Sequence, residues 1–141
     1  MKKLLLFLII SISFCSISKA DTIDIIHIYY NNIKIKECGI FCKDAIVLKL
    51  DSIKDNDSIT VRYFRDTPCT NCDTYLTIDD EASKLIIQIK GKGIWNPLTF
   101  RLNDIKSWSK FHGIKLFNVY YMDNHNIFQE EIYPIFKIKL E

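Results

Sequence analysis

Glycine and proline are scarce in this sequence, which has four glycines and three prolines in 141 residues. Linkers between domains are usually rich in such residues, so their scarcity argues against a flexible linker. The chain also has no internal repeat and no low-complexity segment. Residues 21–141 have a length typical of one domain, and we predict that they form a single one.

The short motifs that identify common enzymes and metal sites are also missing. There is no nucleophile elbow, no HExxH pair and no glycine-rich phosphate loop. The three histidines, His27, His112 and His125, are scattered. Asp79-Asp80 falls in a predicted turn, and Glu130-Glu131 would face opposite sides of a strand, so neither forms a carboxylate pair. These absences predict a protein that is not an enzyme and binds no metal or cofactor.

A cluster of basic residues is missing as well. The whole chain has 19 basic and 17 acidic residues, a formal net charge of +2. Lys2, Lys3 and Lys19 lie in the first twenty residues, so the remainder has 16 basic and 17 acidic residues, a net charge of −1. Such a chain lacks the positive charge that drives binding to nucleic acids or anionic membranes. We expect no nucleic-acid partner and no membrane insertion once the leader is removed.

The first twenty residues have the three parts of a secretory signal peptide. A basic start at residues 1–3 precedes an apolar run over residues 4–14, and small residues end the segment near residue 20. The apolar run is too short for a permanent membrane helix. Phe14 precedes Cys15, whereas a lipoprotein signal has a small residue before its cysteine. We therefore expect an unlipidated protein in the periplasm or secreted into the medium.

Apolar and polar residues alternate with period two through most of the remaining chain, which is rich in Ile, Val, Tyr, Phe and Thr. This pattern is typical of strands with one buried face. It predicts strands at residues 22–30, 33–36, 45–50, 58–65, 74–78, 84–90, 97–102, 114–122, 127–132 and 135–140. Many short strands with frequent turns indicate an all-β fold, a single antiparallel β-sandwich of Ig-like or related topology.

One segment, residues 104–112, fits a short helix or 3-10 segment better than a strand. Its apolar residues recur at every third position: Ile105, Trp108 and Phe111. Asn103 is the expected N-cap, and Gly113 is the expected end of the helix.

Four cysteines stay after Cys15 leaves with the leader: Cys38, Cys42, Cys69 and Cys72. An even number in an exported chain predicts disulfides. Two close pairs also suit a zinc site with four cysteine ligands. A Cys-x2-Cys pair occurs in thiol-redox proteins, where a helix N-terminus lowers the pKa of the first thiol, but here a strand is predicted after the pair. We predict disulfides and keep zinc and redox chemistry as alternatives.

The predicted strands form a meander of hairpins, which places the loops 37–44 and 66–73 at the same end of one sheet. Each loop holds one cysteine pair, so local bridges within a loop compete with crossed bridges between the loops. We favour local pairing, Cys38 with Cys42 and Cys69 with Cys72, because each pair lies at its own hairpin tip.

Three aromatic residues are the candidate partner contacts: Trp95, Tyr120 and Tyr121. Trp95 lies in a loop-like run, residues 91–97, where it either caps the end of the sandwich or projects as an anchor for a protein or a sugar ring. Tyr120 and Tyr121 are consecutive on a predicted strand, so one of them faces outward if only one face is buried.

Small size, a leader, paired cysteines and no active-site motif favour an exported, non-catalytic binding protein of the cell envelope or extracellular space. An inhibitor or immunity-type protein against an envelope-acting enzyme is one concrete form. The first alternative is a carbohydrate-binding module that uses Trp95 and tyrosine side chains. The second is a zinc-binding or thiol-redox protein that uses the four cysteines. A protein partner is therefore expected first, and a glycan second.

When the full chain is expressed with its leader, we expect the protein in the periplasm or the medium with Asp21 as its first residue. The reason is that the small residue before Asp21 suits a signal peptidase. Intact-mass analysis and N-terminal sequencing measure this. A full-length mass, or a lipid attached to Cys15, would contradict the prediction.

Overall fold

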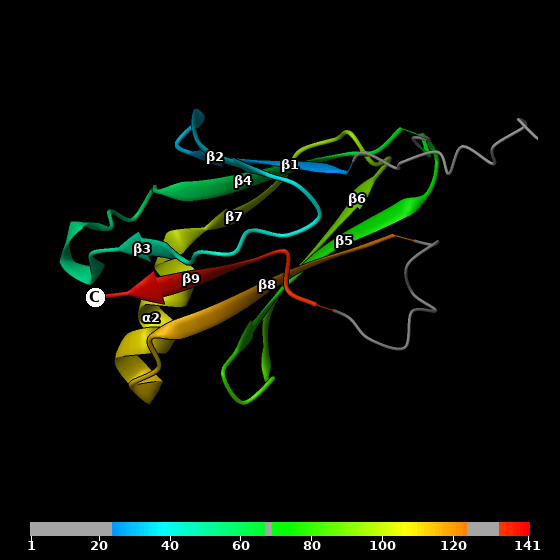
Figure 1. Ribbon diagram of the computed structural model, residues 1–141. Helices are drawn as coiled ribbons and strands as arrows, with labels where there is room; N and C mark the ends of the chain where they lie inside the picture. Colours follow the sequence, from blue (N-terminus) through cyan, green and yellow to red (C-terminus); the bar gives the residue numbers. More distant parts are fainter. Residues whose placement is uncertain (1–23, 67–68, 124–132) are drawn as a thin grey trace, which may run out of the picture.

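Two β-sheets pack face to face in the computed structural model, which describes residues 24–66, 69–123 and 133–141 (Figure 1). Among these residues, one sheet has four strands in the order β2 (Ile33–Cys38), β1 (Ile25–Tyr30), β4 (Ser58–Phe64) and β7 (Leu98–Arg101). The other has five, in the order β3 (Ile46–Leu48), β9 (Phe136–Leu140), β8 (Leu116–Asp123), β5 (Asp73–Asp80) and β6 (Leu85–Lys92). The prediction of an all-β sandwich is confirmed.

Some of the predicted features lie outside the described residues. They are the leader, His125, Glu130-Glu131 and the strand predicted at 127–132.

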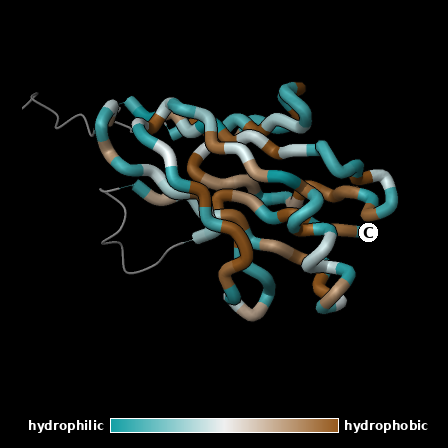
Figure 2. Tube along the Cα trace, turned by 180° about the vertical axis from the view of Figure 1, so that it is seen from behind, coloured by the Kyte–Doolittle hydropathy of each residue, from teal (hydrophilic) through white to brown (hydrophobic). Residues whose placement is uncertain are grey.

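The alternation of apolar residues places one face of each sheet in the core. Residues of this face with no exposed surface include Ile26 and Ile28 of the first sheet and Leu76, Ile78 and Val119 of the second. Burying one such side chain stabilises the fold by about 1.5–3 kcal/mol relative to leaving it exposed. Figure 2 shows hydrophobic stretches running through the middle of the sandwich.

The strands do not form the predicted meander. β2 and β4 both pair with β1 in the first sheet, whereas β3 and β5 belong to the second. Among the described strands, the chain therefore crosses between the sheets after β2, after β3, after β4, after β6 and after β7. β3 is also shorter than the strand predicted at 45–50, because a 3-10 turn, η1 (Leu50–Ser52), follows it. β3 pairs with β9 in parallel, whereas the other strand pairings among the described residues are antiparallel.

The turn predicted at residues 79–81 begins later, because β5 continues through Asp80. The carboxylate of Asp80 accepts hydrogen bonds from the backbone N–H groups of Ala82 and Lys84, at 2.9 and 3.0 Å. These bonds hold the turn after the strand, and Ser83 adopts a positive φ of 60° within it.

The helix α2 (Leu102–His112) begins earlier than predicted. Its N-cap is Arg101 rather than Asn103, since β7 runs directly into the helix. The backbone N–H of Leu102 donates to the carbonyl of Asp57 at 2.9 Å, which satisfies one of the N–H groups that the first turn leaves unpaired. Gly113 ends the helix as predicted, with a left-handed φ of 72°.

The buried face of α2 differs from the predicted stripe. Leu102, Ile105 and Ser109 are buried, whereas Phe111 is 85% exposed. A three-residue spacing drifts around an α-helix, which turns every 3.6 residues, and this drift carries Phe111 off the packed face. Within the described residues, no helix is both long and apolar enough to cross a membrane.

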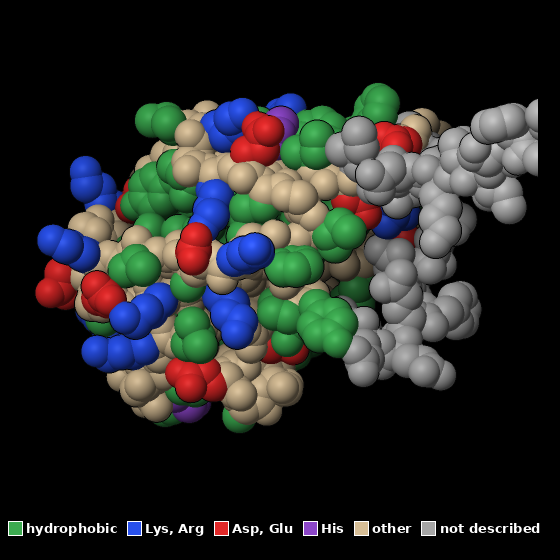
Figure 3. Space-filling model, in the orientation of Figure 1, with side chains coloured by type: hydrophobic (Ala, Val, Ile, Leu, Met, Phe, Trp, Pro, Cys, Tyr) green, Lys and Arg blue, Asp and Glu red, His purple; other side chains and the backbone are tan. Residues whose placement is uncertain are grey.

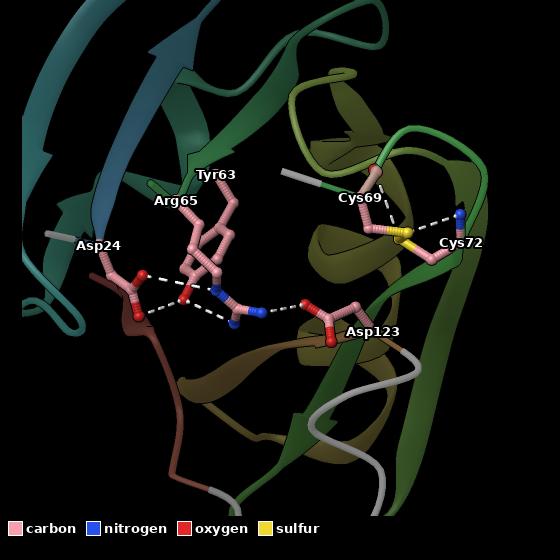
Figure 4. A network of polar contacts seen from close by, with 6 residues as sticks. All are labelled: Asp24, Tyr63, Arg65, Cys69, Cys72 and Asp123. Atoms are coloured by element: carbon pink, nitrogen blue, oxygen red, sulfur yellow. Dashed lines mark hydrogen bonds and ion pairs between the residues drawn. A yellow bond between two sulfur atoms is a disulfide. The ribbon is translucent and has the colours of Figure 1, made fainter. Parts of the chain in front are cut away.

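Arg65 joins the two sheets at one end of the sandwich (Figure 4). Its guanidinium Nε lies 3.5 Å from Oδ1 of Asp24, before β1, and its Nη1 lies 3.2 Å from Oδ2 of Asp123, at the end of β8. Tyr63 donates to Asp24 at 2.7 Å and stacks on Tyr121, with ring centres 4.5 Å apart. Burial and then the bond to Asp24 raise the pKa of Tyr63 to about 12, so the hydroxyl stays a donor. Asp123 has no exposed surface, and the side chains of Arg65 and Asp24 are each 13% exposed, so this charge network is largely buried.

We expect Arg65→Met to lower the free energy of unfolding by roughly 3–5 kcal/mol, because it leaves two carboxylates buried without their counter-charge. Urea unfolding followed by circular dichroism measures the loss. Arg62→Met is the matched control, since Arg62 is exposed on β4. Its loss should stay within about 1 kcal/mol. Equal losses in the two variants would show that the Arg65 network does not hold the sheets together.

Candidate functional site

Three connections between the sheets lie at the end of the sandwich where Arg65 joins them. β2 and β4 both run antiparallel to β1, so both end beside its start. β5 begins where β6 and β8 end, and Arg65 joins the end of β8 to the residue before β1. The connections β2–β3, β4–β5 and β6–β7 are therefore at the same end (Figure 1). We call the described residues of these three connections the loop end.

A disulfide closes the β2–β3 connection and displays two apolar side chains. Cys38, the last residue of β2, pairs with Cys42, and their Cα atoms are 5.3 Å apart. The backbone N–H of Cys42 donates to the carbonyl of Ile135 at 2.7 Å, which fastens the loop to the segment before β9. Ile40 and Phe41 lie inside this small ring and are 59% and 54% exposed. The loop thus holds two large apolar side chains in water on a restrained backbone.

A second disulfide closes the β4–β5 connection (Figure 4). Cys69 pairs with Cys72, with Cα atoms 5.7 Å apart, and the N–H of Cys72 donates to Sγ of Cys69 at 2.9 Å. The N–H of Gly93 donates to the carbonyl of Cys72 at 2.9 Å, and the N–H of Ile94 donates to the carbonyl of Cys69 at 3.0 Å. These bonds join the disulfide loop to the β6–β7 connection.

The cysteines therefore pair locally in both loops, as predicted, although each loop connects the two sheets and is not a hairpin tip. All four are disulfide-bonded, which leaves none of them as a thiolate to bind zinc. β5 begins directly after Cys72, so no helix N-terminus lowers the pKa of a thiol there. Among the described residues, no group of three or more His, Cys, Asp and Glu side chains is arranged to hold a metal ion.

Trp95 projects from the connection that the Cys69 loop supports. Gly93 has a positive φ of 77°, and a Cβ atom there would lie 2.9 Å from the carbonyl oxygen of Thr70, so glycine is required. Ile94 turns into the core and is 1% exposed, whereas Trp95 turns outward and is 54% exposed. Trp95 borders a pocket of about 190 Å³ beside the Cys69 loop. Its ring is thus half exposed on a fixed backbone.

Tyr120 and Tyr121 face opposite sides of β8, as expected for consecutive strand residues. Tyr121 is 7% exposed, and burial raises its pKa above the ordinary value. A buried ring that stacks on Tyr63 cannot contact a partner, so the assignment of Tyr121 as a contact residue was wrong. Tyr120 lies on the outer face of the second sheet and is partly exposed.

The two described histidines have separate partners. His27 lies on β1, and its Nε2 is 3.0 Å from Oε2 of Glu37. His112 ends α2, and its ring stacks on Trp108 with centres 4.0 Å apart. The structure does not bring them together.

The sequence-based search missed Ile40 and Phe41. The signal was present, because two large apolar residues between cysteines four positions apart lie in a ring too small to bury them. The sequence-based prediction for this loop was a disulfide alone.

Comparisons of the chain with protein-family models, with curated proteins and with solved structures find no match. The functional inference therefore depends on the residues described above.

Trp95 and its neighbour form a matched pair for a stability test. We expect Ile94→Ala to lower the free energy of unfolding by roughly 2–5 kcal/mol, because it leaves a cavity in the core. Trp95→Ala should cost only about 1 kcal/mol, because much of the ring is already in water. Thermal and urea unfolding of the two variants measure this difference. A loss for Trp95→Ala as large as that for Ile94→Ala would mean that Trp95 is a core cap.

Proposed function

We propose that this protein is an exported, non-catalytic binding protein whose partner is another protein of the cell envelope or extracellular space. One observation supports this most strongly. Each disulfide at the loop end either displays or supports large exposed apolar side chains, namely Ile40, Phe41 and Trp95. Exposed apolar and aromatic residues on well-defined backbones are typical of the centres of protein interfaces.

The restraint of these loops matters for affinity. Binding costs roughly 0.5–1.5 kcal/mol of entropy for each flexible side chain that it immobilises, and loop ordering adds to this cost. The Cys38–Cys42 ring and the backbone bonds of Gly93 and Ile94 limit the loop motion before a partner arrives. Figure 3 shows apolar side chains lying among charged ones on the face in view.

An inhibitor or immunity-type protein against an envelope-acting enzyme is the form of this function that we propose. Such a protein needs a stable scaffold with a rigid contact surface and no reaction of its own. The paired cysteines suit an oxidising compartment, which supports a location in the periplasm or outside the cell.

A carbohydrate-binding function is the second candidate, and the surroundings of Trp95 favour it. The Trp95 pocket also contains Thr70 and Asn96. An aromatic ring beside hydroxyl and amide groups is suited to stacking on a sugar ring while its hydroxyls are hydrogen-bonded.

The proposal is tested with immobilised protein in an envelope extract of the organism that encodes it. We expect wild type to retain a specific protein, and Phe41→Asp to weaken its binding by about 30-fold, a hot-spot effect. Phe111→Asp is the matched control, because Phe111 is exposed on α2 and outside the loop end. It should bind as wild type does.

Two results would contradict the proposal. One is a partner that binds Phe41→Asp and wild type equally well. The other is retention on peptidoglycan or glycan beads that is lost in Trp95→Ala, which would favour carbohydrate binding instead.

A further inference from the structure

The outer face of the second sheet has a hollow centred on Thr77. Thr77 points away from the core, because Leu76 and Ile78 on either side point inward, yet it is only 7% exposed. Its cross-strand partners are Tyr120 on β8 and Gln88 on β6. A short side chain between two long ones on the same face leaves a depression with threonine at its floor.

This depression, the Thr77 hollow, has a volume of about 430 Å³. Its lining consists of Thr77, Asp79, Leu85, Gln88, Tyr120 and Met122. Apolar surface with a few polar groups is typical of sites for small ligands and single side chains. None of these residues belongs to the loop end, so the hollow is independent of the proposed function.

Asp79 is the one charged residue among the described residues that line the hollow, and its carboxylate is not fully satisfied. Its Oδ1 atom is buried and accepts no hydrogen bond from any described residue. Burial, and then the charge of Asp80, raise the pKa of Asp79 above its ordinary value. A buried acceptor without a donor costs free energy, and a ligand that brings a donor would recover it.

Within the described part of the chain, no lysine or arginine lines the hollow to neutralise this carboxylate. Lys90 lies two residues from Gln88 on the same face of β6, but its Nζ is 2.8 Å from Asp73. The same Nζ lies 5.6 Å from the ring centre of Tyr75. Lys90 is therefore already paired, and the lining of the hollow keeps an unbalanced negative charge.

Tyr120 supplies an aromatic wall beside this charge. Burial and then the charge of Asp79 raise the pKa of Tyr120. A carboxylate beside an aromatic ring favours an organic cation, because the carboxylate forms a charge-assisted hydrogen bond and the ring attracts positive charge.

We propose that the Thr77 hollow binds an ammonium or guanidinium group, with Asp79 as the ion-pair partner and Tyr120 packed against the cation. The cation enters with its alkyl stem against Leu85 and Met122, as lysine and arginine side chains do on apolar surfaces. The source of the group is either a basic side chain of a polypeptide or a free alkylamine, which share this chemistry.

A neutral polyol fits these residues less well. Sugar hydroxyls would donate to Asp79, but they bring no charge to balance it. The hollow therefore discriminates between ligands of similar size by their charge.

The proposal is tested by NMR titration of the full mature protein with small probes. The cationic probes are N-acetyl-lysine methylamide, N-acetyl-arginine methylamide and cadaverine, and the neutral ones are N-acetyl-norleucine methylamide and glucose. We expect cationic probes to shift the amide signals of Thr77, Asp79, Gln88 and Tyr120. The neutral probes should not shift them. Tighter binding of the two amino-acid amides than of cadaverine would identify a polypeptide as the source, and the reverse order a free amine.

Asp79→Asn should weaken binding of the cationic probes by about tenfold or more, because it removes the charge and keeps the shape. Asp73→Asn is the matched control, because Asp73 lies on the same strand and face but is paired with Lys90. It should leave the affinity unchanged within about twofold. Tyr120→Ala should weaken binding, whereas Tyr120→Phe, which keeps the ring, should not. The dispersion of the amide signals shows whether each variant is folded.

Three outcomes would overturn the proposal. They are equal binding of N-acetyl-norleucine methylamide and the lysine probe, stronger binding of glucose than of any cation, and no shift at the hollow with any cationic probe. Unchanged cation binding by folded Asp79→Asn and Tyr120→Ala proteins would also place the cation elsewhere. None of these results tests the function proposed for the loop end.

Discussion

The ion pairs of the largely buried Arg65 guanidinium constrain the end of the sandwich from which the loops project. Its two carboxylate partners come from different places in the chain, Asp24 before β1 and Asp123 at the end of β8. A buried charge network is stable only when every member has its partners, because a single unpaired charge costs several kcal/mol, on the order of 3–5. The ends of β1, β4 and β8 therefore have one relative arrangement, and the three connections of the loop end start from this fixed frame.

The two disulfides act on the loops rather than on the sandwich. Rings as short as Cys38–Cys42 and Cys69–Cys72 remove little entropy from the unfolded chain, so they add little to global stability. Their effect is local. One ring displays Ile40 and Phe41, and the other accepts the backbone bonds that position the β6–β7 connection. Hydrophobic burial thus stabilises the core of the sandwich, whereas the disulfides restrain the loops at its surface.

Much of the fold could be predicted from local patterns, and the remainder depends on long-range pairing. Alternation located most strands, and the presence of each cysteine pair in a single loop favoured the local bridges that the structure has. Alternation could not assign a strand to a sheet, because a strand buries one face in either sheet. The parallel pairing of β3 with β9 joins residues far apart in sequence, and no local pattern marks it.

The candidate sites, too, could be predicted from the sequence only in part. Consecutive tyrosines on a strand had to face opposite sides, but only the structure showed that Tyr121 is the buried one. Whether Trp95 was core or surface depended on how its loop packs on Cys69, which sequence alone does not determine. The Thr77 hollow could not be predicted from the sequence either. It depends on the strand register that places Thr77 between Tyr120 and Gln88.

The sheet edges explain why the loop end is the surface that we assign to a protein partner. β2 is an edge strand with exposed isoleucines, but Lys34 and Lys36 alternate with them, and a bulge interrupts its pairing with β1. β3, one edge of the other sheet, is only three residues long, and β6, its other edge, carries Lys90 and Lys92. Lysines, bulges and short strands are devices by which proteins prevent pairing at sheet edges. No such device accompanies Ile40 and Phe41, which a disulfide ring holds in water, so partner contact accounts for their exposure better than protection of an edge does.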